Sequence, residues 1–295
     1  MVTIERWIER NIKYIFTLPS VLFVAIMIVF PIGYTAYISF FEWSMSSTQP
    51  PQWVFVDNYT NLMQDKRFWL AFARTFYFTS LAIVLEIVLG VAIAVLFNRK
   101  FKGINLIKTL FLLPMVATPV SIGLVWLLIF EPTIGVANQL LGLLGINPQL
   151  WIASPSQVIP SLALVDIWEW TPMITLIALA GLTSIPHDNY EAAQIDGASS
   201  WQMFWKITLP LLMPTVFSAA LLRIIDAIKT YDIIYAMTQG GPGYASETLN
   251  ILGFTLGFQY FQLGYASSLL MVFFFLVLGI SSIIIVLRKR LEVFR

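Results

Sequence analysis

Long apolar runs alternate with short polar connections along almost the whole chain. Six of these runs have the length that a membrane span requires: residues 16–41, 71–97, 109–130, 158–182, 215–237 and 263–287. A bilayer core of about 30 Å is crossed by a helix of about 20 apolar residues. The pattern therefore predicts an all-α membrane protein with six transmembrane helices.

The first fifteen residues have a different pattern. Ile4, Trp7, Ile8 and Ile12 recur at helical spacing, and charged residues occupy the positions between them. A narrow apolar stripe beside a charged face is typical of a helix that lies in the membrane interface. We therefore expect an interfacial amphipathic helix at 1–15, a six-helix transmembrane permease domain at 16–287 and a cytoplasmic tail at 288–295.

Composition supports a membrane protein and excludes several kinds of chemistry. Hydrophobic residues make up 58% of the 295-residue chain and charged residues 11%, which is less charge than a soluble domain carries. The chain has no cysteine, and His187 is its only histidine. Thiolate catalysis, cysteine metal sites and histidine clusters are thereby excluded. A net charge of +1 gives no basic field for nucleic acid.

The positive charges predict the orientation. Lysine and arginine gather in three places: before the first span (Arg6, Arg10, Lys13), between the second and third (Arg99, Lys100, Lys102, Lys108) and after the sixth (Arg288, Lys289, Arg290, Arg295). With six spans all three places share one side, which should be cytoplasmic. Both termini and the connection at 183–213 are then expected in the cytoplasm of a multi-pass protein of the cell membrane.

The connection at 183–213 carries clear turn signals. Asp188 is placed to cap a first short helix, and Gly197 suits the left-handed residue that ends it. Ser199, followed three positions later by Gln202, offers a capping box for a second short helix. Pro210 should stop that helix.

The residues of this connection resemble the EAA loop of ABC importer permeases. The matching positions are Glu191-Ala192-Ala193, Asp196-Gly197-Ala198, Phe204, Ile207 and Leu209-Pro210. The resemblance implies a type I ABC importer permease fold, in which the loop is a coupling helix that docks on a dimer of separate ABC ATPase subunits. The contact residues would be Glu191, Ala192, Ala193, Asp196, Gly197 and Ala198. ATP and Mg²⁺ would be bound by those ATPase subunits, and no cofactor by this non-catalytic chain.

A second segment is similar to carbohydrate-type permeases of the same family. It is the glycine-rich turn at 238–243, preceded by Tyr231-Asp232 and Met237. The resemblance implies a second permease subunit, by family habit a different chain, and an extracytoplasmic substrate-binding protein. The expected function is ATP-driven import, by alternating access, of a sugar, oligosaccharide, polyol or glycerol phosphate.

Ionisable residues inside the spans are the candidate substrate pathway, because buried charges usually face a cavity or a partner. The fourth span carries Asp166 and Glu169 beside Trp170, and the fifth carries Arg223, Asp226, Lys229, Tyr231 and Asp232. These groups could bind sugar hydroxyls, or they could form structural ion pairs, and the sequence leaves both open. Glu86 in the second span is expected to pair with a basic residue.

Two other functions compete with this one. An ion-gradient-driven secondary transporter would use the mid-membrane charges as a relay, but that function does not explain the residues of the 183–213 connection. An intramembrane enzyme would need a histidine cluster, a cysteine or an activated serine, and none is apparent. The sequence has no G-x-x-x-x-G-K-[ST] loop. An ABC importer of this type must therefore draw its energy from another subunit.

Overall fold

The computed structural model describes residues 2–99 and 101–293, and nearly all regular structure in them is helical. The chain forms two compact units. The first unites Met1–Asp65 with Gly253–Phe274, and the second unites Lys66–Leu252 with Phe275–Arg295.

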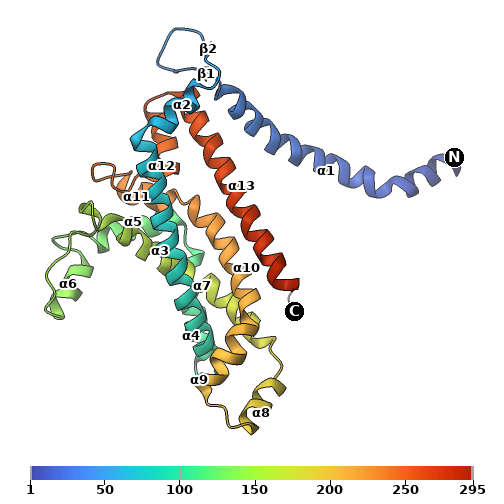
Figure 1. The fold of residues 1–295 in the computed structure, drawn as a ribbon, viewed down its shortest axis with the longest axis vertical. Coiled ribbons are helices and arrows are strands. Elements are labelled where there is room, and N and C mark those ends of the chain that lie inside the picture. Colours follow the sequence, from blue (N-terminus) through green and yellow to red (C-terminus); the bar gives the residue numbers. More distant parts are fainter. Residues whose placement is uncertain (1, 100, 294–295) are drawn as a thin grey trace. The chain divides into compact units, whose positions relative to one another are not determined.

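The first unit begins with one long helix, α1 (Val2–Ile38), which Figure 1 shows as a continuous curved ribbon. The predicted interfacial segment at 1–15 thus runs without a break into the first span. The side chains of its amphipathic stripe lie mostly outside the described residues, so its interfacial position stays a prediction. A two-stranded hairpin that we did not predict follows, formed by β1 (Phe41–Glu42) and β2 (Gln52–Trp53).

The rest of the first unit holds this hairpin in place. Helix α2 (Asp57–Gln64) carries Asn58, whose amide nitrogen donates to the carbonyl groups of Ser39 and Phe41, each at 2.9 Å. The C-terminal part comprises the end of α12 (Leu249–Phe254), a π-turn (Thr255–Gln259) and the start of α13 (Leu263–Val293).

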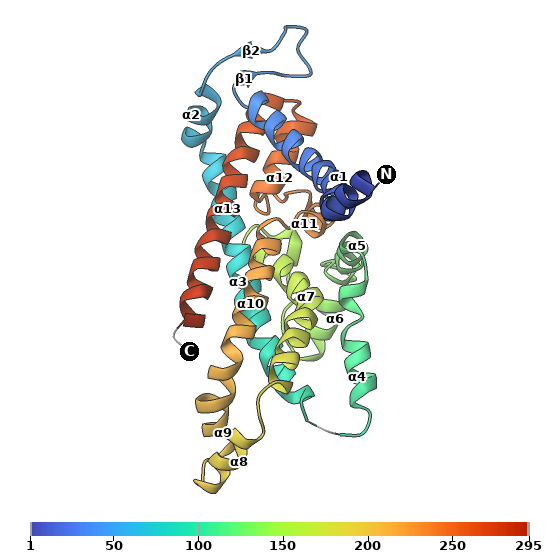
Figure 2. The ribbon, with the colours of Figure 1, turned by 90° about the vertical axis from the view of Figure 1, so that its right-hand side faces the viewer.

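The second unit is built on three long helices. Helix α7 (Val158–Thr183) packs against both α3 (Lys66–Phe97) and α10 (Leu209–Ile228), and α10 also contacts α3 (Figures 1 and 2). Shorter helices complete the unit: α4 (Ile104–Phe111), α5 (Pro119–Ile129), α6 (Val136–Leu143), α8 (Asp188–Ile195), α9 (Ser200–Met203) and α11 (Asp232–Thr238). Helix α11 packs against α5.

A glycine permits the close approach of α3 and α7. A Cβ atom at Gly90 would lie 2.6 Å from Cγ2 of Ile174 and 3.3 Å from the backbone nitrogen of Thr175. Helices in membranes associate through packing of this kind, because lipid removes the hydrophobic drive between them.

We expect Gly90→Ala to lower the free energy of unfolding of the purified protein by about 1–3 kcal/mol, because the added methyl overpacks the α3–α7 contact. Thermal unfolding in detergent, followed by size-exclusion fluorescence, measures this. Gly279→Ala is the matched control, since Gly279 is also helical and a Cβ there meets nothing within 4 Å. Equal unfolding temperatures for the two variants would contradict the argument that Gly90 is needed for the α3–α7 packing.

The third expected span, 109–130, is not one helix. Helix α4 ends at Phe111, a 3₁₀ turn follows at Pro114–Val116, and α5 begins at Pro119. Ala117 and Thr118 have extended backbones, and Thr118 directly precedes Pro119, whose ring disfavours a helical conformation at that residue. The prediction of a continuous third span was wrong because the two prolines interrupt the helical hydrogen bonds.

The fifth expected span, 215–237, is also broken. Helix α10 ends at Ile228, and α11 begins only at Asp232. The carbonyl of Lys229, at the C-cap, accepts a hydrogen bond from the side-chain amide of Asn250. That bond satisfies one carbonyl of the ended helix. Because α10 ends there, Asp232 lies in a different helix from Arg223 and Asp226.

Five helices of the described chain are long and apolar enough to cross a membrane: Asn11–Ile38, Lys66–Phe97, Val158–Thr183, Ser200–Ile228 and Leu263–Val286. Pro119–Ile129 is apolar but shorter. The all-α membrane fold is confirmed, whereas the count of six spans and the cytoplasmic termini stay predictions.

Candidate functional sites

The connection at 183–213 folds as its local signals predict, with one shift at its start. Helix α8 ends at Ile195, and Gly197, two residues later, has a left-handed backbone with φ of 78°. The N–H of Gly197 donates to the carbonyl of Gln194 at 3.0 Å, and the N–H of Ala198 to that of Ala193 at 2.9 Å. Asp188 is the first helical residue and not the cap, a position that His187 takes. The predicted Asp188 cap was therefore wrong, although its charge still suits the helix N-terminus.

The second short helix begins at the predicted capping box. The N–H of Gln202 donates to Oγ of Ser199 at 3.3 Å, and the N–H of Ser199 donates to Oε1 of Gln202 at 2.8 Å. Pro210 does not end this helix. Helix α9 continues through a π-turn (Phe204–Thr208) into α10. The wider turn accommodates the proline, which lacks an N–H donor, so the predicted stop at Pro210 was wrong.

The turn between α8 and α9 is exposed and partly apolar. Ile195 is 87% exposed and Trp201 is 70% exposed. A Cβ at Gly197 would meet nothing within 4 Å. Of the predicted contact residues, Glu191, Ala192, Asp196 and Gly197 are exposed, and Ala193 and Ala198 are half-buried. The six residues therefore form one open surface of small and acidic side chains.

One contact fixes this turn to the start of α10. The hydroxyl of Tyr190 lies 3.0 Å from Oγ1 of Thr208, which is buried in the π-turn. The turn is therefore held to the helix that follows it by a side-chain contact as well as by the chain itself.

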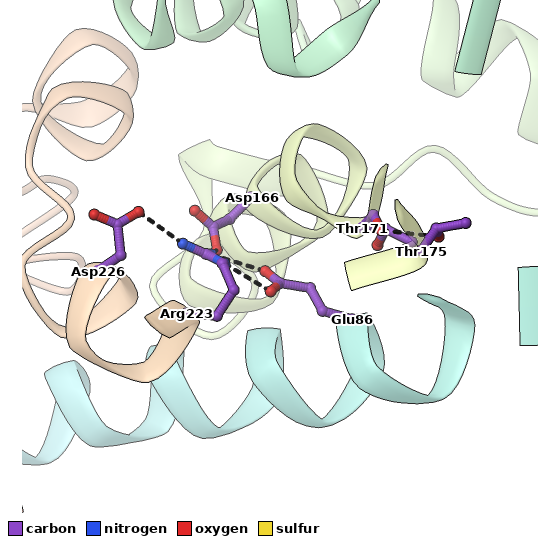
Figure 3. A network of polar contacts seen from close by, with 6 residues as sticks. All are labelled: Glu86, Asp166, Thr171, Thr175, Arg223 and Asp226. Carbon is purple, nitrogen blue, oxygen red and sulfur yellow. Dashed lines mark hydrogen bonds and ion pairs between the residues drawn. The ribbon is translucent and has the colours of Figure 1, made fainter. Parts of the chain in front are cut away.

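A buried arginine is the centre of the charges within the spans (Figure 3). Nε and Nη2 of Arg223 donate to the two carboxylate oxygens of Glu86 at 2.8 and 2.9 Å. Nη2 also donates to Oδ2 of Asp166 at 2.6 Å, and Nη1 donates to Oδ2 of Asp226 at 3.0 Å. The guanidinium thus joins α3, α7 and α10, and the expected basic partner of Glu86 is confirmed.

Several oxygens around this arginine have no hydrogen-bond partner among the described residues. They include Oδ1 of Asp166 and Oε2 of Glu169, both buried. The ring of Trp170 lies against the guanidinium, with its centroid 4.9 Å from Cζ of Arg223. The carboxylate oxygens that face Arg223 are therefore paired with it, while Oδ1 of Asp166 and Oε2 of Glu169 remain available as acceptors.

A cavity of about 220 Å³ lies beside the cluster. Its lining includes Asp166, Trp170, Asp226, Lys229, Tyr231 and Asp232. The structure thus brings six of the seven predicted pathway residues to one cavity, and Glu169 is the exception. Lys229 and Asp232 form no ion pair with any residue that the structure describes.

A second ion pair, in the outer part of the unit by the predicted topology, was not predicted. Nε and Nη2 of Arg67 donate to the two oxygens of Glu247, each at 2.7 Å. Cζ of Arg67 also lies 4.1 Å from the ring centroid of Tyr244. Arg67 and Glu247 lie in polar segments between the predicted spans and are 180 positions apart. Helical spacing therefore could not predict that they pair.

The chain matches a known family. The family described as "Binding-protein-dependent transport system inner membrane component" matches residues 86–288, which is more than half of the chain. A "Probable ABC transporter permease protein y4oQ" of Sinorhizobium fredii is 38% identical over 90% of this chain and 86% of the relative. A "Trehalose/maltose transport system permease protein MalF" of Thermococcus litoralis is 35% identical over 87% of this chain and 85% of the relative.

The fold is also similar to that of a solved structure. A chain in the crystal structure of a bacterial ABC transporter involved in the import of the acidic polysaccharide alginate superposes with a TM-score of 0.84. The match covers 98% of this chain and 99% of that chain, at 22% sequence identity.

Proposed function

The chain belongs to the family of inner membrane components of binding-protein-dependent transport systems, and from this premise we propose that it imports a carbohydrate. It is a multi-pass permease subunit of an ABC importer. The substrate that we propose is a sugar, oligosaccharide, polyol or glycerol phosphate. The similarity to a trehalose/maltose permease over most of both chains supports this class best. Nothing in the comparisons supports the ion-gradient alternative.

The energy for import would come from an ABC ATPase dimer that docks on the turn between α8 and α9. The turn combines small and acidic residues with two exposed large apolar side chains, Ile195 and Trp201, which a docked partner would cover. The open space at Gly197 allows a partner backbone to approach closely. ATP and Mg²⁺ would be held by the ATPase subunits.

The substrate would pass beside the Arg223 cluster. The cavity lined by Asp166, Trp170 and Asp226 is smaller than the range of about 300–1,000 Å³ that is usual for complete ligand sites. One chain would therefore supply only part of the passage. A second permease subunit, of different sequence, would supply the rest, and the extracytoplasmic binding protein would deliver the substrate.

Uptake by the assembled system tests this function. The chain would be purified with its ATPase, the second permease and the binding protein and reconstituted into vesicles. We expect accumulation of a labelled neutral sugar that requires ATP and the binding protein. Accumulation driven by a proton or sodium gradient without ATP would overturn the proposal, as would purification of the functional chain without an ATPase.

A further inference from the structure

The charges around the cavity beside Arg223 are unequal. Of the charged residues that line the cavity, three are carboxylates (Asp166, Asp226, Asp232) and one is a cation (Lys229). The cavity wall therefore carries a formal excess of negative charge, which repels an anionic ligand.

The buried cation has almost no capacity left for a ligand. A guanidinium has five N–H donors, and four hydrogen bonds already run from Arg223 to Glu86, Asp166 and Asp226. The side chain of Arg223 is fully buried, and it is not among the residues that line the cavity. An anionic ligand could not recruit this arginine without breaking an existing ion pair.

The carboxylates, in contrast, still have room to accept hydrogen bonds. Asp166 lines the cavity, is 1% exposed, and has one buried oxygen with no described partner. Asp226 uses Oδ2 for Arg223, lines the cavity, and has a side chain that is 53% exposed. An ionised carboxylate accepts hydrogen bonds and cannot donate them. The wall therefore fits a ligand rich in hydroxyl or ammonium donors.

We infer that this cavity is a selectivity site that accepts neutral or amino sugars by their donor groups and rejects uronates and sugar phosphates. The inference rests on the proposed function and narrows it, since it removes glycerol phosphate from the candidate substrates. The Trp170 ring supplies an apolar wall beside the acceptors. Repulsion between an anionic ligand and the carboxylates of the wall is the physical basis of the rejection.

Direct binding to the purified complex in nanodiscs, without the binding protein, tests the inference. Three tritiated ligands are compared at equal ionic strength: a neutral disaccharide, the same disaccharide with one ring oxidised to a uronate, and its phosphate ester. We expect the two anions to bind at least ten-fold more weakly than the neutral ligand. Asp226→Asn keeps the shape of the side chain and removes one charge. It should lower the affinity for the neutral disaccharide, and it should reduce the ratio of neutral to anionic affinities several-fold.

Glu42→Gln is the control, because Glu42 is an exposed carboxylate in β1 and is not a lining residue of this cavity. It should leave all three affinities unchanged. Anions that bind as tightly as the neutral disaccharide would overturn the inference, and so would affinities that Asp226→Asn does not alter. ATP-driven uptake of an acidic sugar would refute the selectivity but leave the importer function standing. Failure of ATP-driven uptake for every carbohydrate would refute the function itself.

Discussion

Replacing Arg223 with methionine should destabilise the protein by about 3–5 kcal/mol, because it leaves buried carboxylates without their cation. Glu86 and Asp166 are 0% and 1% exposed and both depend on the same guanidinium. Apolar side chains of similar volume fill the space but supply no donors. The amount of monodisperse protein extracted from membranes, and its unfolding temperature, measure the loss.

Two comparisons separate charge from packing at Arg223. Arg223→Lys keeps the charge but loses the forked geometry that reaches three carboxylates, so its loss should be intermediate. Arg67→Met breaks the Arg67–Glu247 pair, and its loss should be smaller because Arg67 is 24% exposed to solvent. Adding Glu86→Gln and Asp166→Asn to Arg223→Met should restore part of the stability. A triple variant no more stable than Arg223→Met would show that the charges are not the cause.

Gly197→Val should reduce ATP-driven transport at least ten-fold in reconstituted vesicles. Gly197 has φ of 78°, a region that costs an ordinary residue about 1–2 kcal/mol and a β-branched residue more. The added side chain would also stand on the surface where we propose that the ATPase docks. Hydrolysis by the bound ATPase subunits should persist, so that each transported molecule consumes more ATP.

Asparagine provides the matched control at this position. It tolerates the left-handed backbone better than other residues with a side chain, so Gly197→Asn should retain most of the transport that Gly197→Val loses. If both variants transported as the parent does, neither the backbone of Gly197 nor its surface would matter for coupling. If both variants were expressed normally but neither transported, the cause would be the added side chain at the proposed ATPase contact and not the backbone conformation.

The turn between α8 and α9 could be predicted in detail because its signals are local. The Gly197 turn and the Ser199–Gln202 capping box each involve residues a few positions apart, and both are present. Pro210 misled because its effect depends on the turn before it, and a π-turn is not visible in residue spacing. Local rules therefore gave the start of α9 but not its continuation into α10.

The charge cluster shows where spacing fails. The spacing of three positions between Arg223 and Asp226 agrees with the ion pair that they form across one helical turn. It could not reveal that the same guanidinium also binds Glu86 and Asp166, because those contacts join positions 137 and 57 residues away. The break of the fifth span after Ile228 was likewise hidden, since no proline or glycine marks it. The two prolines that break the third span are visible in the sequence. The span was still predicted as one helix, because its apolar run is long enough to cross a membrane.

The unbroken course of the helix from Ser200 to Ile228 has a mechanical consequence. At about 1.5 Å per residue, the proposed ATPase contact near Ser200 and the charge cluster at Arg223 are about 35 Å apart along this helix. A small tilt imposed at one end becomes a displacement of several ångströms at the other, unless the π-turn at Phe204–Thr208 absorbs it by bending. The stiffness of that π-turn would then determine how much of a movement of the proposed ATPase reaches Arg223.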